Sequence, residues 1–200
     1  MVVFDLEYTA WKGSIARNWS APGEHREIVQ VGAVRLNPAL AWRETASLTV
    51  LVRPRINPRI SDYLIALTGI TQERVDAEGV ALDEALAQLA ALGEGATFWS
   101  NGPDGEVIAE NCMLIRFPSP IAPERFIDVR PFLARMLQRS PSEIDSYRLA
   151  GEFCGGNPGH AHDALADARG VAAALRWVLQ TTQGNDVKRL QHGVRRTRRC

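Results

Sequence analysis

Runs of apolar residues mark three segments near the start of the chain. Residues 2–7, 28–36 and 47–52 carry many apolar and β-branched side chains, a composition that favours strands. A polar stretch with turn-forming residues separates the first two segments, and Asn37-Pro38 is typical of a hairpin connection between the second and the third. The chain is therefore expected to begin with three sequential strands.

Beyond residue 58 the apolar residues recur every three or four positions, which is the period of a helix. Leu82, Leu86, Leu89 and Leu92 form a stripe that predicts a helix ending at Gly93. Further helices are expected at residues 60–67, 71–75, 107–115, 131–138, 142–150 and 164–179, and further strands at 96–99 and 126–129. This order predicts one α/β domain with a five-stranded mixed sheet flanked by helices.

Composition agrees with an ordinary soluble globular domain. The 200 residues are 46% hydrophobic and 23% charged, and the chain is long enough for one full core. No apolar run approaches the roughly 18 residues that span a bilayer, and no basic segment or cleavage site follows Met1, so we expect neither a membrane span nor a signal peptide. Cys112, Cys154 and Cys200 lack metal-ligand spacing and suit reduced thiols, which favours a cytoplasmic protein.

The formal net charge of zero hides an asymmetry along the chain. Six of the 23 Lys and Arg residues follow position 187, whereas all 23 Asp and Glu residues precede it. We therefore expect a domain at residues 1–182 and a basic, disordered tail at residues 183–200. The tail either contacts phosphates or is a solvated end without function. The acidic domain would bind nucleic acid poorly without local compensation, which makes a metal-filled acidic site of interest.

Asp5 and Glu7 are two residues apart on the first predicted strand, so their side chains point to the same face. Phe4 and Leu6 point to the opposite face. Two neighbouring carboxylates repel each other and are costly to desolvate, and a bound cation would offset both costs. The alternative is an exposed strand end where both acids are solvated, and the pair alone does not decide between the two.

Two further segments place polar side chains at the ends of predicted elements. Asp163 is a natural N-cap for a helix beginning at Ala164, which places His162 on the preceding loop and Asp167 in the first turns. The alternative is a capped helix with an incidental histidine. Asp104 follows a strand candidate, at a place where α/β proteins often carry functional residues, but it also suits an ordinary turn.

Taken together, these residues form a set suited to metal-assisted phosphoryl chemistry. Carboxylate oxygens are good ligands for Mg²⁺ or Mn²⁺. Two such ions about 3.5–4 Å apart can stabilise the attacking and leaving oxygens of an in-line displacement. A histidine nearby can take the proton of the attacking water. The set comprises four acids and one histidine: Asp5, Glu7, Asp104, Asp167 and His162.

The order Asp5-x-Glu7, Asp104 and His162-x₄-Asp167 resembles that of the DEDDh exonucleases, also called the DnaQ-like family, of RNase H-like fold. The resemblance runs from Val2 to about residue 179. The segments at residues 4–7 and 161–168 are its most specific parts. Residues 54–58 and 67–71 resemble the branch that contains the Eri-type 3′ exoribonucleases and the bacterial KapD-like proteins.

The resemblance implies a 3′→5′ exonuclease that releases nucleoside 5′-monophosphates from single-stranded 3′ ends, with RNA favoured over DNA. It implies that the four acids hold two Mg²⁺ or Mn²⁺ ions and that His162 is the general base. It also leaves open a protein partner or a homodimer. The residues that would contact the terminal nucleotide are Leu6, Leu67, Thr68, Gly69, Ile70 and His162.

Three points stay open at this stage. Relatives in this branch usually carry an extra residue before the second-motif aspartate, so the tight Gly102-Pro103-Asp104 segment makes Glu106 a rival of Asp104. The long loop at residues 11–25 is either a lid or substrate clamp or a surface insertion. A domain that kept the fold and lost catalysis is the rival function, although all five groups that the chemistry needs are present.

Overall fold

The computed structural model describes residues 1–154 and 162–181. Its centre is the five-stranded mixed sheet that the sequence predicts, with strand order β3-β2-β1-β4-β5. Neighbours in the β1-β2-β3 half pair antiparallel, and β4 pairs parallel with both β1 and β5, so β1 is the central strand. The strands are β1 (Val2–Tyr8), β2 (Ile28–Asn37), β3 (Arg43–Leu51), β4 (Phe98–Ser100) and β5 (Phe126–Asp128).

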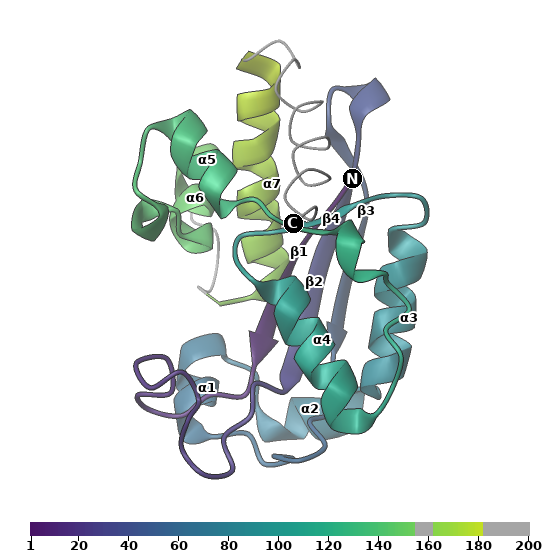
Figure 1. Ribbon diagram of the computed structural model, residues 1–200, viewed down its shortest axis with the longest axis vertical. Coiled ribbons are helices and arrows are strands. Elements are labelled where there is room, and N and C mark those ends of the chain that lie inside the picture. Colours follow the sequence, from purple (N-terminus) through teal and green to yellow (C-terminus); the bar gives the residue numbers. More distant parts are fainter. Residues whose placement is uncertain (155–161, 182–200) are drawn as a thin grey trace, which may run out of the picture.

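Helices cover both faces of this sheet (Figure 1). On one face, α5, α6 and α7 bury apolar side chains against Val3 and Trp99. On the other, α3 and α4 pack against Phe4 and Phe98, while α1 and α2 form a third core at the end of the sheet where β1 ends. The helices are α1 (Asp62–Thr68), α2 (Gln72–Glu78), α3 (Leu82–Leu92), α4 (Asp104–Ile115), α5 (Arg130–Leu137), α6 (Ser146–Phe153) and α7 (Ala164–Thr181).

Two elements begin four residues away from the start that the sequence predicts. β3 begins at Arg43 rather than at residue 47, because an edge strand with exposed side chains shows little apolar alternation. The helix expected from residue 142 begins instead at Ser146. Its N-cap is Asp145, whose side chain accepts a hydrogen bond of 3.0 Å from the Arg148 backbone N–H, and residues Pro141–Glu143 form a separate 3₁₀ turn.

Close approach of α7 to β2 depends on a glycine. A Cβ at Gly32 would lie 2.1 Å from both the Ala164 carbonyl carbon and the Leu165 nitrogen, so only a residue without a side chain fits. Gly32 pairs with Asp5 of β1 in the sheet register. The first turn of α7 is therefore held over β2 next to the acidic residues of β1.

The basic tail expected at residues 183–200 lies outside the described residues, so the domain boundary and the tail's disorder stay predictions. No helix in the described ranges is both long and apolar enough to cross a bilayer.

Candidate active site

β1 presents Asp5 and Glu7 to the face of the sheet that α7 covers. In the pairing with β2, Asp5 lies opposite Gly32 and Glu7 opposite Gln30. Phe4 lies in the core on the other face, as the alternation of the strand predicts. The Glu7 residue is only 7% exposed, so its carboxylate is not a solvated acid at a strand end.

Asp104 reaches the same place from the end of β4. After Ser100 the chain turns through Gly102, whose φ of 142° is accessible to glycine, and enters α4 at Asp104. The Ser100 hydroxyl donates to the Gly102 carbonyl at 2.9 Å and holds the turn. Asp104 is buried and lines the same cleft as Asp5 and Glu7. Glu106 is exposed and lines a different hollow, between α4 and β5.

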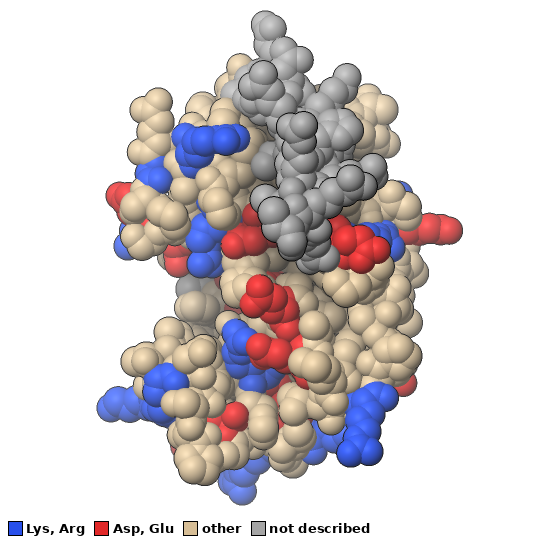
Figure 2. All heavy atoms as spheres, viewed as in Figure 1, with Lys and Arg blue, Asp and Glu red and all other residues tan. Residues whose placement is uncertain are grey.

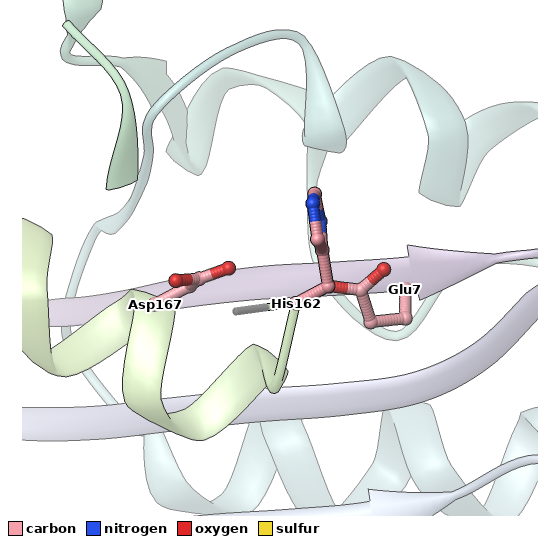
Figure 3. Close-up of side chains that lie close together, drawn as sticks. All are labelled: Glu7, His162 and Asp167. Atoms are coloured by element: carbon pink, nitrogen blue, oxygen red, sulfur yellow. The ribbon is translucent and has the colours of Figure 1, made fainter. Parts of the chain in front are cut away.

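The start of α7 supplies His162 and Asp167. The Asp163 side chain accepts from the Ala166 backbone N–H at 2.9 Å, which is the N-cap geometry that the sequence predicts. His162 precedes it with a left-handed φ of 61°, and its Nδ1 lies 3.9 Å from Glu7 Oε1. Figure 3 shows Glu7 on β1 beside His162, with Asp167 on the adjoining turn of α7. One ligand atom from each of the three residues falls within 4.8 Å of the others.

Burial and mutual repulsion make these acids reluctant to ionise. Burial raises the pKa of Glu7 to about 9, and the carboxylates of Asp167, Asp104 and Asp163 add to the rise. Burial likewise raises the pKa of Asp5 well above its usual range, with Asp104 as the next cause. The Arg130 guanidinium acts in the opposite direction on Asp5.

The two remaining acids are shifted in the same direction. Burial raises the pKa of Asp104 to about 7, against the lowering effects of Arg130 and Arg26. Burial raises the pKa of Asp167 to about 7, and the Asp145 and Asp163 carboxylates contribute. A bound cation would stabilise the charged forms of these clustered carboxyls, so the site is suited to a cation.

The donor set also fits divalent ions. Asp167 Oδ1 is buried and has no hydrogen-bond partner among the described residues, although a buried carboxylate oxygen is costly to leave unsatisfied. Asp167 lines the same cleft as Asp5, Glu7 and Asp104. All four acids offer oxygen ligands, the type that Mg²⁺ and Mn²⁺ prefer. The residues present therefore fit the ions that the sequence resemblance implies.

A cleft of about 400 Å³ surrounds the acids. One wall consists of the loop after β1 and of α1, with Ile15, Trp19 and Leu67. The opposite wall is the start of α6, where Tyr147 is 39% exposed. The space-filling view shows a hollow between the part of the molecule that carries α5 and α6 and the part that carries α1 (Figure 2). Apolar and aromatic walls above an acidic floor can hold a nucleobase and a phosphate side by side.

Residues other than the four acids and His162 also line this cleft, notably Trp19, Tyr147, Asn101 and Arg130. Arg130 donates hydrogen bonds to the Asn101 carbonyl and side-chain oxygens. Asn101 in turn donates to the Ile144 carbonyl at 3.2 Å, which ties the turn after β4 to the wall that carries Tyr147. Two of these residues lie in segments that the sequence did mark, Asn101 in the turn before Asp104 and Trp19 in the long loop at residues 11–25.

The long loop after β1 is a structured wall of the cleft. Trp19 Nε1 donates to the Thr9 carbonyl at 2.9 Å, and the Trp19 ring lies 5.4 Å from the ring of Tyr8. Arg17 and Glu24 form an ion pair inside the loop. Ile15 and Trp19 of the segment at residues 11–25 therefore line the cleft, and its role as a lid, a substrate clamp or a surface insertion stays a prediction.

The structure separates the residues expected to contact a terminal nucleotide. Leu67 lines the cleft, as does Leu6, although Leu6 is 5% exposed and belongs to the core behind β1. Thr68 and Ile70 are buried, and Gly69 ends α1 with a φ of 71°, so none of the three lines the cleft. The sequence carries a second histidine two residues before His162, and this residue, His160, lies outside the described residues.

The fold and the site together define an RNase H-like α/β nuclease domain of the DnaQ-like type. A model of the RNase_T family, described as exonuclease, matches residues 2–175. The chain belongs to this family of exonucleases, of the DEDDh type. The DEDDh resemblance drawn from the sequence is thereby confirmed.

The curated relatives are longer proteins, and this chain matches one part of each. ERI1 exoribonuclease 2 of Mus musculus is 26% identical over 204 residues, which cover 88% of this chain and 28% of the relative. ERI1 exoribonuclease 2 of Homo sapiens is 25% identical over 207 residues, with coverage of 88% and 28%. The chain thus spans little more than a quarter of the length of these relatives.

Solved structures share the fold. The nuclease domain of 3′hExo, a DEDDh family member bound to rAMP, has a TM-score of 0.77 at 22% identity, with 92% of each chain covered. Exonuclease I of E. coli in complex with a dT13 oligonucleotide has a TM-score of 0.67 at 17% identity, with 91% of this chain and 41% of that chain covered.

Proposed function

We propose that this chain is a two-metal-ion 3′→5′ exonuclease that removes nucleotides one at a time from single-stranded 3′ ends, with RNA as the preferred substrate. The observation that carries the proposal is the convergence of Asp5, Glu7, Asp104 and Asp167 on one cleft, with Asp167 Oδ1 buried and unpaired and His162 at the rim. Family membership supports the reaction type.

In this proposal the four acids hold two Mg²⁺ or Mn²⁺ ions, which would stabilise the attacking and leaving oxygens of an in-line displacement. The His162 side chain accepts a proton from the water that attacks the terminal phosphorus. The bond from phosphorus to the 3′ oxygen of the preceding nucleotide breaks, and that oxygen leaves as a hydroxyl with a proton from solvent. The His162 side chain is 46% exposed, so it can return its proton to solvent after each cycle.

The aromatic walls of the cleft favour an unpaired nucleic-acid end as the substrate. The cleft is lined on opposite sides by Trp19 and by Tyr147, and aromatic side chains bind unpaired bases by stacking. Contacts that hold Trp19 to the backbone of Thr9 keep this wall in place before a ligand binds. The preference for RNA rests on the curated relatives, whose names describe exoribonucleases.

The test uses RNA and DNA oligonucleotides of one sequence, each labelled at the 5′ end, as single strands and as blunt duplexes. With Mn²⁺ or Mg²⁺ we expect a ladder of products shortened by single nucleotides, faster on single-stranded RNA than on DNA, and stopped by EDTA. Asp5→Asn serves as the inactive control and Glu106→Gln as the active one. A protein that binds the oligonucleotides without shortening them would be a binding module, and faster cutting of DNA would reverse the substrate preference.

A further inference from the structure

Gln30 is a buried polar side chain next to the acids that takes no direct part in the proposed chemistry. It lies on β2 opposite Glu7 in the sheet register and is 4% exposed. Both ends of its amide group contact the start of α7. Gln30 Oε1 accepts from the Ala164 backbone N–H at 3.1 Å, and Gln30 Nε2 lies 3.4 Å from Asp163 Oδ2.

These contacts tie the first turn of α7 to the sheet. Ala164 is the first residue of α7, so its N–H has no acceptor inside the helix, and Gln30 supplies one. Asp163 uses Oδ1 to cap the Ala166 N–H and Oδ2 to meet Gln30. A single side chain from β2 therefore satisfies the helix start and orients the residue that caps it.

His162 is the residue that this arrangement holds in place. It immediately precedes Asp163 and has a φ of 61°, a left-handed conformation that is uncommon for residues other than glycine. Its Nδ1 lies 3.9 Å from Glu7 Oε1, a spacing set by the position of α7 over β1 and β2. Gln30 is the side chain of β2 that contacts the two residues directly after His162.

We infer that Gln30 is a positioning residue for His162, and this inference rests on the proposed function. It acts through Ala164 and Asp163 rather than by touching substrate. Glutamine is suited to the place because one amide group supplies the acceptor for Ala164 and the donor for Asp163. Methionine of similar size supplies neither, whereas glutamate keeps the acceptor and sets a second carboxylate against Asp163.

The kinetic test compares Gln30→Met with the wild type and with Thr49→Val. Thr49 is the other neighbour of Gln30 Nε2, at 3.4 Å, and is exposed, so its loss should leave turnover near wild type. Gln30→Met should lower kcat about 10–100-fold, since small misplacements of a reacting group are this costly, while KM changes less than about twofold. The kcat of Gln30→Glu should lie between those of the wild type and Gln30→Met. This variant replaces Gln30→Met in the test if Gln30→Met does not fold.

A double variant separates positioning from a general loss of structure. If Gln30 acts through His162, Gln30→Met should cost almost nothing once His162 is alanine, so the double variant should turn over within about twofold of His162→Ala. An equal loss in both backgrounds would overturn the inference, because the effect would then reach the site by another route.

Hydrogen exchange tests the same contact without catalysis. In the metal-free protein, the Ala164 amide should exchange at least about tenfold faster in Gln30→Met than in the wild type, while the Leu175 amide in the middle of α7 is unchanged. Unchanged exchange at Ala164 would overturn the inference. Faster exchange in a protein that cuts no oligonucleotide would support the contact and refute the proposed function instead.

Discussion

Gly32 and Ala164 are in contact across the interface of β2 and α7, with no space between them for a side chain. A Cβ on Gly32 would overlap the Ala164 backbone at 2.1 Å, and backbone atoms of a capped helix cannot rotate away as a flexible side chain can. Since Ala164 follows His162 and Asp163 directly, this one contact sets how close the start of α7 comes to Asp5 and Glu7.

Gly32→Ala should therefore damage the site and the fold together. Overpacking at a tight interface costs roughly 1–3 kcal/mol, and the shift of α7 should lower turnover by at least about tenfold. Urea denaturation and the oligonucleotide assay measure the two effects. Gly151→Ala is the matched control, because a Cβ there meets nothing within 4 Å and α6 should gain stability. Wild-type behaviour of Gly32→Ala would contradict the contact.

Asp5→Asn should abolish cutting and stabilise the metal-free protein. The substitution removes a carboxyl whose pKa is raised by burial and by the carboxylates of Asp104, Glu7 and Asp167, and which is therefore costly to ionise in the folded protein. The melting temperature without metal should rise, at about 2–4 °C for each kcal/mol of repulsion removed. Scanning calorimetry in EDTA and the oligonucleotide assay in Mn²⁺ measure both. Activity near wild type at saturating Mn²⁺ would exclude Asp5 as a ligand.

Stability of the metal-free protein should fall as pH rises from about 5 to 9. Glu7, Asp104 and Asp167 have folded-state pKa values near 9, 7 and 7, above their ordinary values, so the folded state holds more protons than the unfolded chain in this window. Between its unfolded-state and folded-state pKa values, each such group lowers the free energy of unfolding by at most about 1.4 kcal/mol per pH unit. The decline ends once the pH passes the folded-state pKa of the group.

Melting curves at pH 5, 7 and 9, with EDTA and with Mn²⁺, measure this effect. Mn²⁺ should restore stability most at pH 9, where the ligands give up protons most easily. The Glu7→Gln variant should show a flatter pH dependence in EDTA. A melting temperature that rises with pH in EDTA would contradict the proposed origin of the shifts.

Asp104 and Glu106 should respond differently to loss of charge. Asp104 is buried in the cleft, and Glu106 is exposed beside another hollow. Asp104→Asn should remove activity, whereas Glu106→Gln should keep turnover within about twofold of wild type, as surface substitutions usually do. The opposite pattern in the oligonucleotide assay would move the second motif by two residues.

His162→Ala should lower turnover by about 10²–10⁴-fold, the usual contribution of a positioned acid–base group. Binding of Mn²⁺, measured by calorimetry, should survive, because the proposal assigns the metal sites to the four acids. His25→Ala is a suitable control, since His25 does not line the cleft. Full turnover in His162→Ala would remove His162 from the role of base.

Elements with a strong apolar period were predictable from the sequence, and the leucine stripe of α3 and the alternation of β1 reappear in the structure. Local caps were also predictable, since the Asp163 side chain meets the Ala166 N–H as expected. The first residues of β3, which face solvent, were not predictable, because an edge strand carries little apolar signal.

Cleft residues away from the motifs could not be predicted, because their positions depend on tertiary contacts. Tyr147 reaches the site only because α6 packs on α7 at Gly170, where a Cβ would lie 2.6 Å from the Ser146 oxygen. Trp19 is held by Thr9 at the start of its own loop. Similarity in sequence alone could not show that Thr68 and Ile70 turn inward, which is a property of how α1 ends.

Order of synthesis has a consequence for when this site can exist. Asp5 and Glu7 belong to β1 and Asp167 to α7, so the ends of a segment of about 160 residues must meet before the set is complete. A growing chain that has not yet exposed α7 has β1 without the oxygen ligand and the histidine that α7 brings. Within this domain, the full set of acids and His162 therefore comes together only after α7 has emerged and folded.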